Sequence, residues 1–158
     1  MANEVLVNEE NQFVVFKLAQ ETYGVDINHV REIITLQSIT EVPGTIDFIE
    51  GIINLRGYVI PVFNLRKKFM LPEEEFTKAA RIVVVDVAGN TLGMTVDGVS
   101  EVLRISNGDI EKPSRVITAS VETEYIHGIA KLEDKLVIIL ELDKILNDEE
   151  QLALENIN

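Results

Sequence analysis

Few side chains in this sequence have the types and spacing that catalysis requires. The two histidines, His29 and His127, lie in unrelated contexts, so a histidine-based metal site would need both to converge by folding. There is no cysteine, which excludes a thiolate nucleophile, a disulfide and a sulfur-ligated metal. No glycine-rich phosphate loop, GxSxG turn or HExxH motif is present. We therefore expect no enzyme activity, no metal and no cofactor.

Three aspartates, Asp26, Asp86 and Asp97, lie in or beside apolar runs that are typical of strands. Acidic residues are common at turns and strand ends, and no base or nucleophile accompanies these three in a pattern that indicates paired-carboxylate chemistry. A small β-barrel enzyme or ligand-binding domain stays open as an alternative. That alternative requires a deep pocket that contains a strongly perturbed acid.

Arg56 is the most informative polar residue. It is flanked by Leu55 and Gly57 and lies between two apolar runs. A guanidinium fork held there could bind a carboxylate or backbone carbonyls. A solvated arginine at a hairpin tip fits the same spacing, and the spacing alone does not decide between the two.

The chain contains one pattern twice. Residues 49–69 align without gaps with residues 126–146, and two earlier segments align with residues 82–87 and 92–102. Gly51 falls on Gly128, which favours a backbone reason for both glycines, such as a bulge or a close approach between chains. The copies differ between residues 54–57 (NLRG) and the aligned residues 131–134 (KLED), where Glu133 occupies the repeat position of Arg56.

Composition limits the possible partners. A length of 158 residues suits one domain or two very small units, and 46% hydrophobic residues fit a globular protein. The net charge of −13 disfavours binding to nucleic acid and anionic membranes, although a nucleic-acid-binding barrel remains an alternative that a steep loss of nucleic-acid affinity with salt would reveal.

We expect the basic run Arg66-Lys67-Lys68 to be a solvated strand or helix end. Without a signal peptide or a spanning apolar run, we expect a cytoplasmic protein with no direct membrane insertion.

Short runs rich in valine and isoleucine, separated by Gly, Asp and Asn, predict a mainly β protein. The expected strands are residues 12–18, 21–27, 49–55, 58–65, 81–87, 91–96, 98–105, 126–131 and 135–142, and residues 30–40 predict a turn that leads into a strand or a first helical turn. We expect two packed five-stranded barrels, residues 12–77 and 78–146, between which strands could be exchanged. Residues 147–158 would form a helical or frayed tail, with Asp143 as a candidate N-cap.

The sequence resembles a known family most clearly in residues 51–62, GIINLRGYVIPV, continued by Asn64-Leu65-Arg66. This segment is similar to the signature of the bacterial chemotaxis coupling proteins, the CheW family. The segments YGVDI at 23–27 and VDGV at 96–99 lie where that family has them. The similarity extends from about residue 12 to residue 146.

The resemblance implies two five-stranded SH3-like β-barrels with a hydrophobic core between them. It implies a non-enzymatic adaptor that links the regulatory domain of the histidine kinase CheA to the cytoplasmic hairpin tips of methyl-accepting chemoreceptors, in membrane-associated arrays. A non-chemotactic kinase pathway that uses the same adaptor stays open. The implied receptor-facing residues are Val30, Glu32, Gly51, Arg56, Val83, Gly93, Val99 and Val102. The implied kinase-facing residues are Ile27, Val116 and Ile117. The resemblance leaves open whether some of the glycines and valines shape the groove rather than contact a partner.

Overall fold

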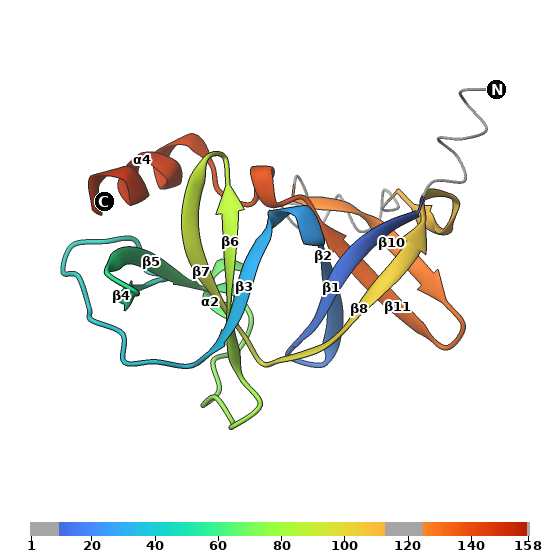
Figure 1. Ribbon diagram of the computed structural model, residues 1–158, viewed down its shortest axis with the longest axis horizontal. Coiled ribbons are helices and arrows are strands. Elements are labelled where there is room, and N and C mark those ends of the chain that lie inside the picture. Colours follow the sequence, from blue (N-terminus) through green and yellow to red (C-terminus); the bar gives the residue numbers. More distant parts are fainter. Residues whose placement is uncertain (1–9, 113–124, 158) are drawn as a thin grey trace.

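The computed structural model describes residues 10–112 and 125–157, which form two β-sheets side by side with one C-terminal helix (Figure 1). The elements in chain order are β1 (Glu10–Leu18), β2 (Glu21–Asp26), the 3-10 turn η1 (Ile27–His29), β3 (Val30–Thr35), β4 (Ile49–Leu55), β5 (Tyr58–Asn64), α2 (Leu65–Lys68), β6 (Arg81–Val87), β7 (Asn90–Val96), β8 (Gly98–Ser106), η2 (Asn107–Asp109), β9 (Ile110–Glu111), β10 (Ile126–Leu132), β11 (Lys135–Leu140), η3 (Leu142–Lys144) and α4 (Asp148–Ile157). The expected strands therefore form close to their predicted bounds.

Each sheet combines strands from both repeats. Sheet A has the order β8-β1-β2-β11-β10-β9, and sheet B has the order β3-β6-β7-β5-β4. The hairpin β1–β2 of the first repeat thus lies in sheet A, together with β10 and β11 of the second repeat. The hairpin β6–β7 of the second repeat lies in sheet B, together with β4 and β5 of the first repeat. Along the chain the first repeat precedes the second, whereas in space the two sheets exchange their first hairpins.

The two sheets are built to the same register. In sheet A, β2 and β11 are parallel with Gly24 opposite Ile139, and in sheet B, β7 and β5 are parallel with Gly93 opposite Val62. Both β4 and β10 carry an irregularity just before a glycine, Gly51 or Gly128. Equivalent sequence positions therefore occupy equivalent places in the two sheets.

Gly51 and Gly128 both lie where another chain segment comes close. Gly51 has φ +147°, and a Cβ there would overlap the carbonyl oxygen of Thr40. A Cβ at Gly128 would lie 2.5 Å from Cγ2 of Ile110. The predicted backbone reason for the repeated glycine, a bulge with a close approach, is confirmed at both positions.

Three apolar clusters hold the fold together. The central cluster lies between the sheets and includes Phe16, Phe63 and Leu142. The cluster of sheet B consists of Ile53, Leu55, Ile60, Val62, Ile82 and Val84, and that of sheet A consists of Phe13, Ile105, Ala130, Val137 and Ile139. The structure thus confirms a mainly β fold of two SH3-like units with a core between them. Among the described residues, however, the edge strands β3 and β4 are not paired with each other, and sheet A gains the two-residue strand β9 as its sixth.

The C-terminal helix begins later than the sequence predicted. Asp143 lies in the 3-10 turn η3 and does not cap a helix, because Ile145 and Leu146 after it are buried in the central core and the chain must turn there. Asn147 caps α4: its Oδ1 accepts the N–H of Glu150 at 2.8 Å, and Oε1 of Glu150 accepts the N–H of Asn147 at 2.8 Å. This reciprocal pair is a capping box. Figure 1 shows that α4 follows the strands of sheet A yet lies on the side of sheet B.

The expectation of a solvated basic run is wrong. The side chain of Arg66 is only 7% exposed and pairs with Asp97, and Lys68 is nearly as buried and pairs with Glu150 at 2.8 Å. Lys67 is half-buried between Glu50 and Glu73, at 3.4 Å and 3.3 Å. The acidic excess of the chain supplies a carboxylate to each of the three cations, so this run offers no free cationic patch. Within the described ranges, no helix is long and apolar enough to cross a membrane.

Candidate protein-docking surface

A groove of about 770 Å³ opens at one end of sheet B. Its lining comes from β3, the β4–β5 turn, β6 and β7, and consists of Arg31, Glu32, Leu55, Arg56, Gly57, Tyr58, Val59, Ile60, Val84 and Thr91. Leu55, Ile60 and Val84 also belong to the apolar cluster of sheet B. The floor of the groove is therefore apolar, and its rim carries the charged side chains.

The β4–β5 turn presents Arg56 at this rim. Arg56 and Gly57 have φ values of +51° and +90°, the left-handed pair that a two-residue type I′ hairpin turn requires. The side chain of Asn54 accepts the N–H of Gly57 at 2.8 Å, which stabilises the turn from inside. Gly57 supplies the positive φ at little cost, and the Arg56 side chain projects into solvent.

Arg56 pairs with Glu32 of β3, another of the predicted receptor-facing residues. The hydrogen bond that Arg56 donates to Glu32, together with the negative charge of Glu32, raises the pKa of the Arg56 guanidinium above its ordinary value. The sequence left open whether this fork binds a carboxylate or carbonyls or is a solvated arginine at a hairpin tip. In the structure Arg56 is an exposed arginine of the turn, and its fork contacts a carboxylate of the same chain. Because exposed ion pairs contribute little to stability, an incoming partner can replace this pair at small cost.

A second pair crosses the rim. Nε of Arg31 on β3 donates to both carboxylate oxygens of Asp86 on β6, at 2.8 Å and 3.0 Å. The hydroxyl of Thr91 on β7 donates to the same carboxylate at 2.9 Å. The side of the groove formed by β3, β6 and β7 is thus cross-linked by polar contacts.

Apolar side chains beside Arg56 were not singled out from the sequence. Tyr58 is 76% exposed and Val59 is 53% exposed, and Ile33 on β3 is also exposed. The available signal was the position of Tyr58 and Val59 directly after a turn, where a hairpin extends beyond the sheet that covers it. Tyr58 and Val59 line the groove and add an exposed apolar surface of the kind that marks an interface.

Sheet A carries a counterpart of this surface. Glu101 on β8 pairs with Lys135 at 3.0 Å, as Glu32 on β3 pairs with Arg56. Beside that pair Val102 and Leu136 are exposed, at the repeat positions of Ile33 and Val59. The second copy therefore lacks the arginine of the turn but has a cation opposite the glutamate two positions later, at the first residue of β11.

The remaining candidates lie deeper. Val30, Val99 and Ile27 are half-buried and pack against the central core. Val83 is fully buried in that core, and Gly93 is buried where a Cβ would lie 2.8 Å from Cγ2 of Ile82. Val83, Gly93 and the buried Gly51 can therefore shape the surface but do not form it. Val116 and Ile117 lie outside the described residues.

The two histidines lie in separate polar contacts. Nδ1 of His29 is 3.1 Å from the carbonyl oxygen of Asp86, and Nδ1 of His127 is 3.0 Å from Oε2 of Glu141. In the part of the chain that the structure describes, no group of three or more His, Asp or Glu side chains could hold a metal ion.

Comparison with known proteins decides the family. The family model of the CheW-like domain matches residues 12–150, almost the whole sequence. The chain belongs to the CheW family. Among solved structures, this CheW-family chain is similar to the scaffolding protein TtCheW from Thermoanaerobacter tengcongensis, with a TM-score of 0.82 and 42% identity, covering 90% of this chain and 96% of that one. The resemblance drawn from residues 51–62 is confirmed.

Curated relatives match this chain over most of their length. The chemotaxis protein CheW of Treponema pallidum is 35% identical over 156 residues, which is 96% of this chain and 91% of the relative. The chemotaxis protein CheW of Helicobacter pylori is 36% identical over 140 residues, which is 88% of this chain and 84% of the relative. The similarity therefore spans both sheets and does not rest on one motif.

Proposed function

We propose that this CheW-family chain is an adaptor that couples the regulatory domain of the kinase CheA to the cytoplasmic tips of methyl-accepting chemoreceptors. The observation that carries the proposal is the match to CheW proteins over nearly the whole length of this chain and of the compared proteins. The chain would act in the cytoplasm, recruited to receptor arrays at the membrane, and would support array assembly and control of the kinase without chemistry of its own.

The receptor tip would dock at the groove of sheet B. A receptor hairpin presents amphipathic helices, and an apolar floor with a charged rim suits such a helix, which places apolar side chains at i, i+3, i+4 and i+7. Tyr58 and Val59 supply the exposed apolar contact, and the Arg56–Glu32 pair supplies charges that can exchange partners. Val102 on β8 would extend the receptor-facing surface onto sheet A.

The kinase would dock elsewhere, around η1. Ile27 lies in this turn, between β2 of sheet A and β3 of sheet B. The family resemblance adds Val116 and Ile117 to the kinase-facing set, and implies that the regulatory domain shares this fold, so that the two proteins would meet end to end. Each contact would be weak on its own, since an array gains avidity from many simultaneous links.

A pair of NMR titrations tests the proposal. Isotope-labelled chain is titrated first with a receptor tip fragment and then, separately, with the isolated regulatory domain of the kinase. We expect the receptor fragment to shift the amide signals of residues 31–33 and 56–59, and the kinase domain to shift those of residues 27–29. No response to either ligand, or one identical footprint for both, would refute the adaptor role.

A further inference from the structure

Asp97 occupies the point at which the chain passes from one sheet to the other. β7 of sheet B ends at Val96 and β8 of sheet A begins at Gly98, so Asp97 is the only residue between them. Its backbone N–H donates to the carbonyl oxygen of Lys17 on β1 at 3.0 Å, and its Oδ2 accepts the N–H of Ala19 at 2.7 Å. Asp97 is thus bonded to the first hairpin of sheet A.

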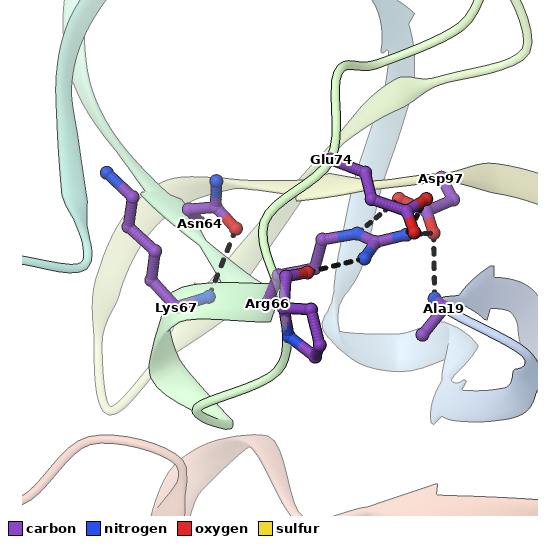
Figure 2. Close-up of polar contacts among 7 residues, drawn as sticks. Ala19, Asn64, Arg66, Lys67, Glu74 and Asp97 are labelled. Carbon is purple, nitrogen blue, oxygen red and sulfur yellow. Dashed lines mark hydrogen bonds and ion pairs between the residues drawn. The ribbon is translucent and has the colours of Figure 1, made fainter.

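Arg66 reaches the same carboxylate from the side of sheet B (Figure 2). It lies in α2, directly after β5, and its side chain is 7% exposed. Nε donates to Oδ1 of Asp97 at 3.0 Å and Nη2 donates to Oδ2 at 2.5 Å, which makes the contact bidentate. Nη1 donates to the carbonyl oxygen of Pro72 in the segment that joins the repeats, at 2.7 Å. Hydrogen bonding to Asp97 raises the pKa of Arg66 although burial opposes the shift.

The internal repeat provides a second junction for comparison. Asp143 occupies the repeat position of Arg66, and Ala88 occupies that of Ala19. Oδ1 of Asp143 accepts the N–H of Ala88 at 3.2 Å, and Nε2 of His29 lies 4.0 Å from Oδ2 of Asp143 with both side chains partly exposed. This junction therefore has one longer hydrogen bond and a histidine, where the first has a buried bidentate arginine.

The central core restrains the angle between the sheets through close packing of its side chains. The hydrophobic term itself is non-directional, so a directional polar contact adds a restraint that apolar burial does not supply. A planar guanidinium that meets a carboxylate in a fork does specify an angle, because both hydrogen bonds must stay aligned. Since Asp97 is bonded to sheet A and Arg66 extends from sheet B, that constraint acts between the sheets.

We propose that Arg66 and Asp97 are positioning residues that fix the orientation of sheet B relative to sheet A. Resting on the proposed function, the consequence is that the receptor-facing groove of sheet B is held at a defined angle to the kinase-facing residues beside η1. The adaptor would then behave as one rigid unit, so that a change in the orientation of a bound receptor would also change the orientation of the bound kinase. Arg66–Asp97 would be the rigid junction between the sheets, and His29–Asp143 the looser one.

Residual dipolar couplings of the full-length chain test this orientation without any partner. Couplings from amides of sheet A and of sheet B are fitted separately in the unchanged protein, in Arg66→Lys, in Asp97→Asn and in the control Asp143→Asn at the repeat-related junction. Arg66→Lys keeps the charge but not the fork, so it remains informative should Asp97→Asn unfold. Dispersed amide spectra and slow hydrogen exchange within each sheet verify that a variant is folded.

We expect one alignment tensor to fit both sheets in the unchanged protein and in Asp143→Asn. In Arg66→Lys and in any folded Asp97→Asn, we expect two tensors that differ in orientation or magnitude. A single shared tensor in Arg66→Lys, identical to that of the unchanged protein, would overturn the proposal. Because no kinase or receptor is present, this outcome is independent of the adaptor role, which the separate titrations test.

Discussion

Arg56 on the β4–β5 turn and Glu32 on β3 form an ion pair at the rim of the sheet B groove, and both were predicted to face the receptor. The pair has a counterpart in sheet A, Lys135 with Glu101, at the equivalent rim. A cation opposite a β3 or β8 glutamate is thus a property of both units. An arginine at the turn, with its planar fork, is found in sheet B but not at the equivalent turn of sheet A. Replacing Arg56 therefore tests docking without removing a feature that both units need for folding.

Replacing Arg56 with glutamate should weaken binding of a receptor tip fragment by roughly tenfold or more, because it places a second carboxylate beside Glu32 and removes the charge-assisted contact. The melting temperature should change little, since the Arg56 side chain is largely exposed. Isothermal calorimetry with the fragment and a thermal melt measure the two effects. Lys131→Glu is the control: Lys131 lies in an exposed pair with Glu111 at the edge of sheet A opposite β8, and its replacement should leave fragment binding near that of the unchanged protein. Loss of thermal stability in proportion to loss of binding would indicate a structural arginine instead.

Gly51→Ala should destabilise the fold by at least about 2 kcal/mol, because the new Cβ would overlap the carbonyl oxygen of Thr40 and the backbone has φ +147°. Urea denaturation followed by circular dichroism measures the loss. Gly98→Ala is the control, because a Cβ there meets only ordinary contacts at 3.6 Å, and we expect a change within about 1 kcal/mol. Equal stability of the two variants would contradict the close approach at β4.

The sequence predicted the strands and the duplication because both follow from local patterns, such as the apolar run of Arg81–Val87 and the shared glycine at 51 and 128. It left open whether strands are exchanged and did not say which, because β1–β2 can pair equally well with either set of partner strands until the long-range contacts are known. The burial of Arg66 also depends on a distant partner, Asp97, and a basic run looks solvated without it. The site was predicted only in part: Glu32 and Arg56 meet, whereas Tyr58 and Val59 resembled ordinary strand residues.

Tyr23 should make stability pH-dependent in alkali. Burial raises the pKa of its hydroxyl above the ordinary value of 10.0, and the charge of Glu21 adds to the effect. Since the folded state holds this proton more tightly, its contribution is complete below about pH 10 and is lost as the pH rises through the folded-state pKa. Urea melts between pH 8 and pH 11 should show a steeper decline than in Tyr23→Phe, which keeps the ring that stacks on Phe16. Parallel curves for the two proteins would show that Tyr23 does not cause the decline.

Asn147→Ala should loosen α4 by removing one half of its capping box, at a cost of about 1 kcal/mol. Hydrogen exchange of the α4 amides should accelerate while exchange in β6 and β7 stays slow, because those two strands are held by their own antiparallel pairing. Exchange that accelerates equally throughout sheet B would mean that the helix and the sheet unfold as one unit.

Coupling itself is tested most directly by a co-sedimentation measurement with three components. The regulatory domain of the kinase is mixed with receptor tip fragments tethered to vesicles, with and without this CheW-family chain. The account predicts that the regulatory domain sediments substantially more with the vesicles when the chain is added, and that Arg56→Glu abolishes most of this gain while still binding the kinase domain in solution. Recovery of the regulatory domain that is unchanged by adding the chain would contradict the adaptor role.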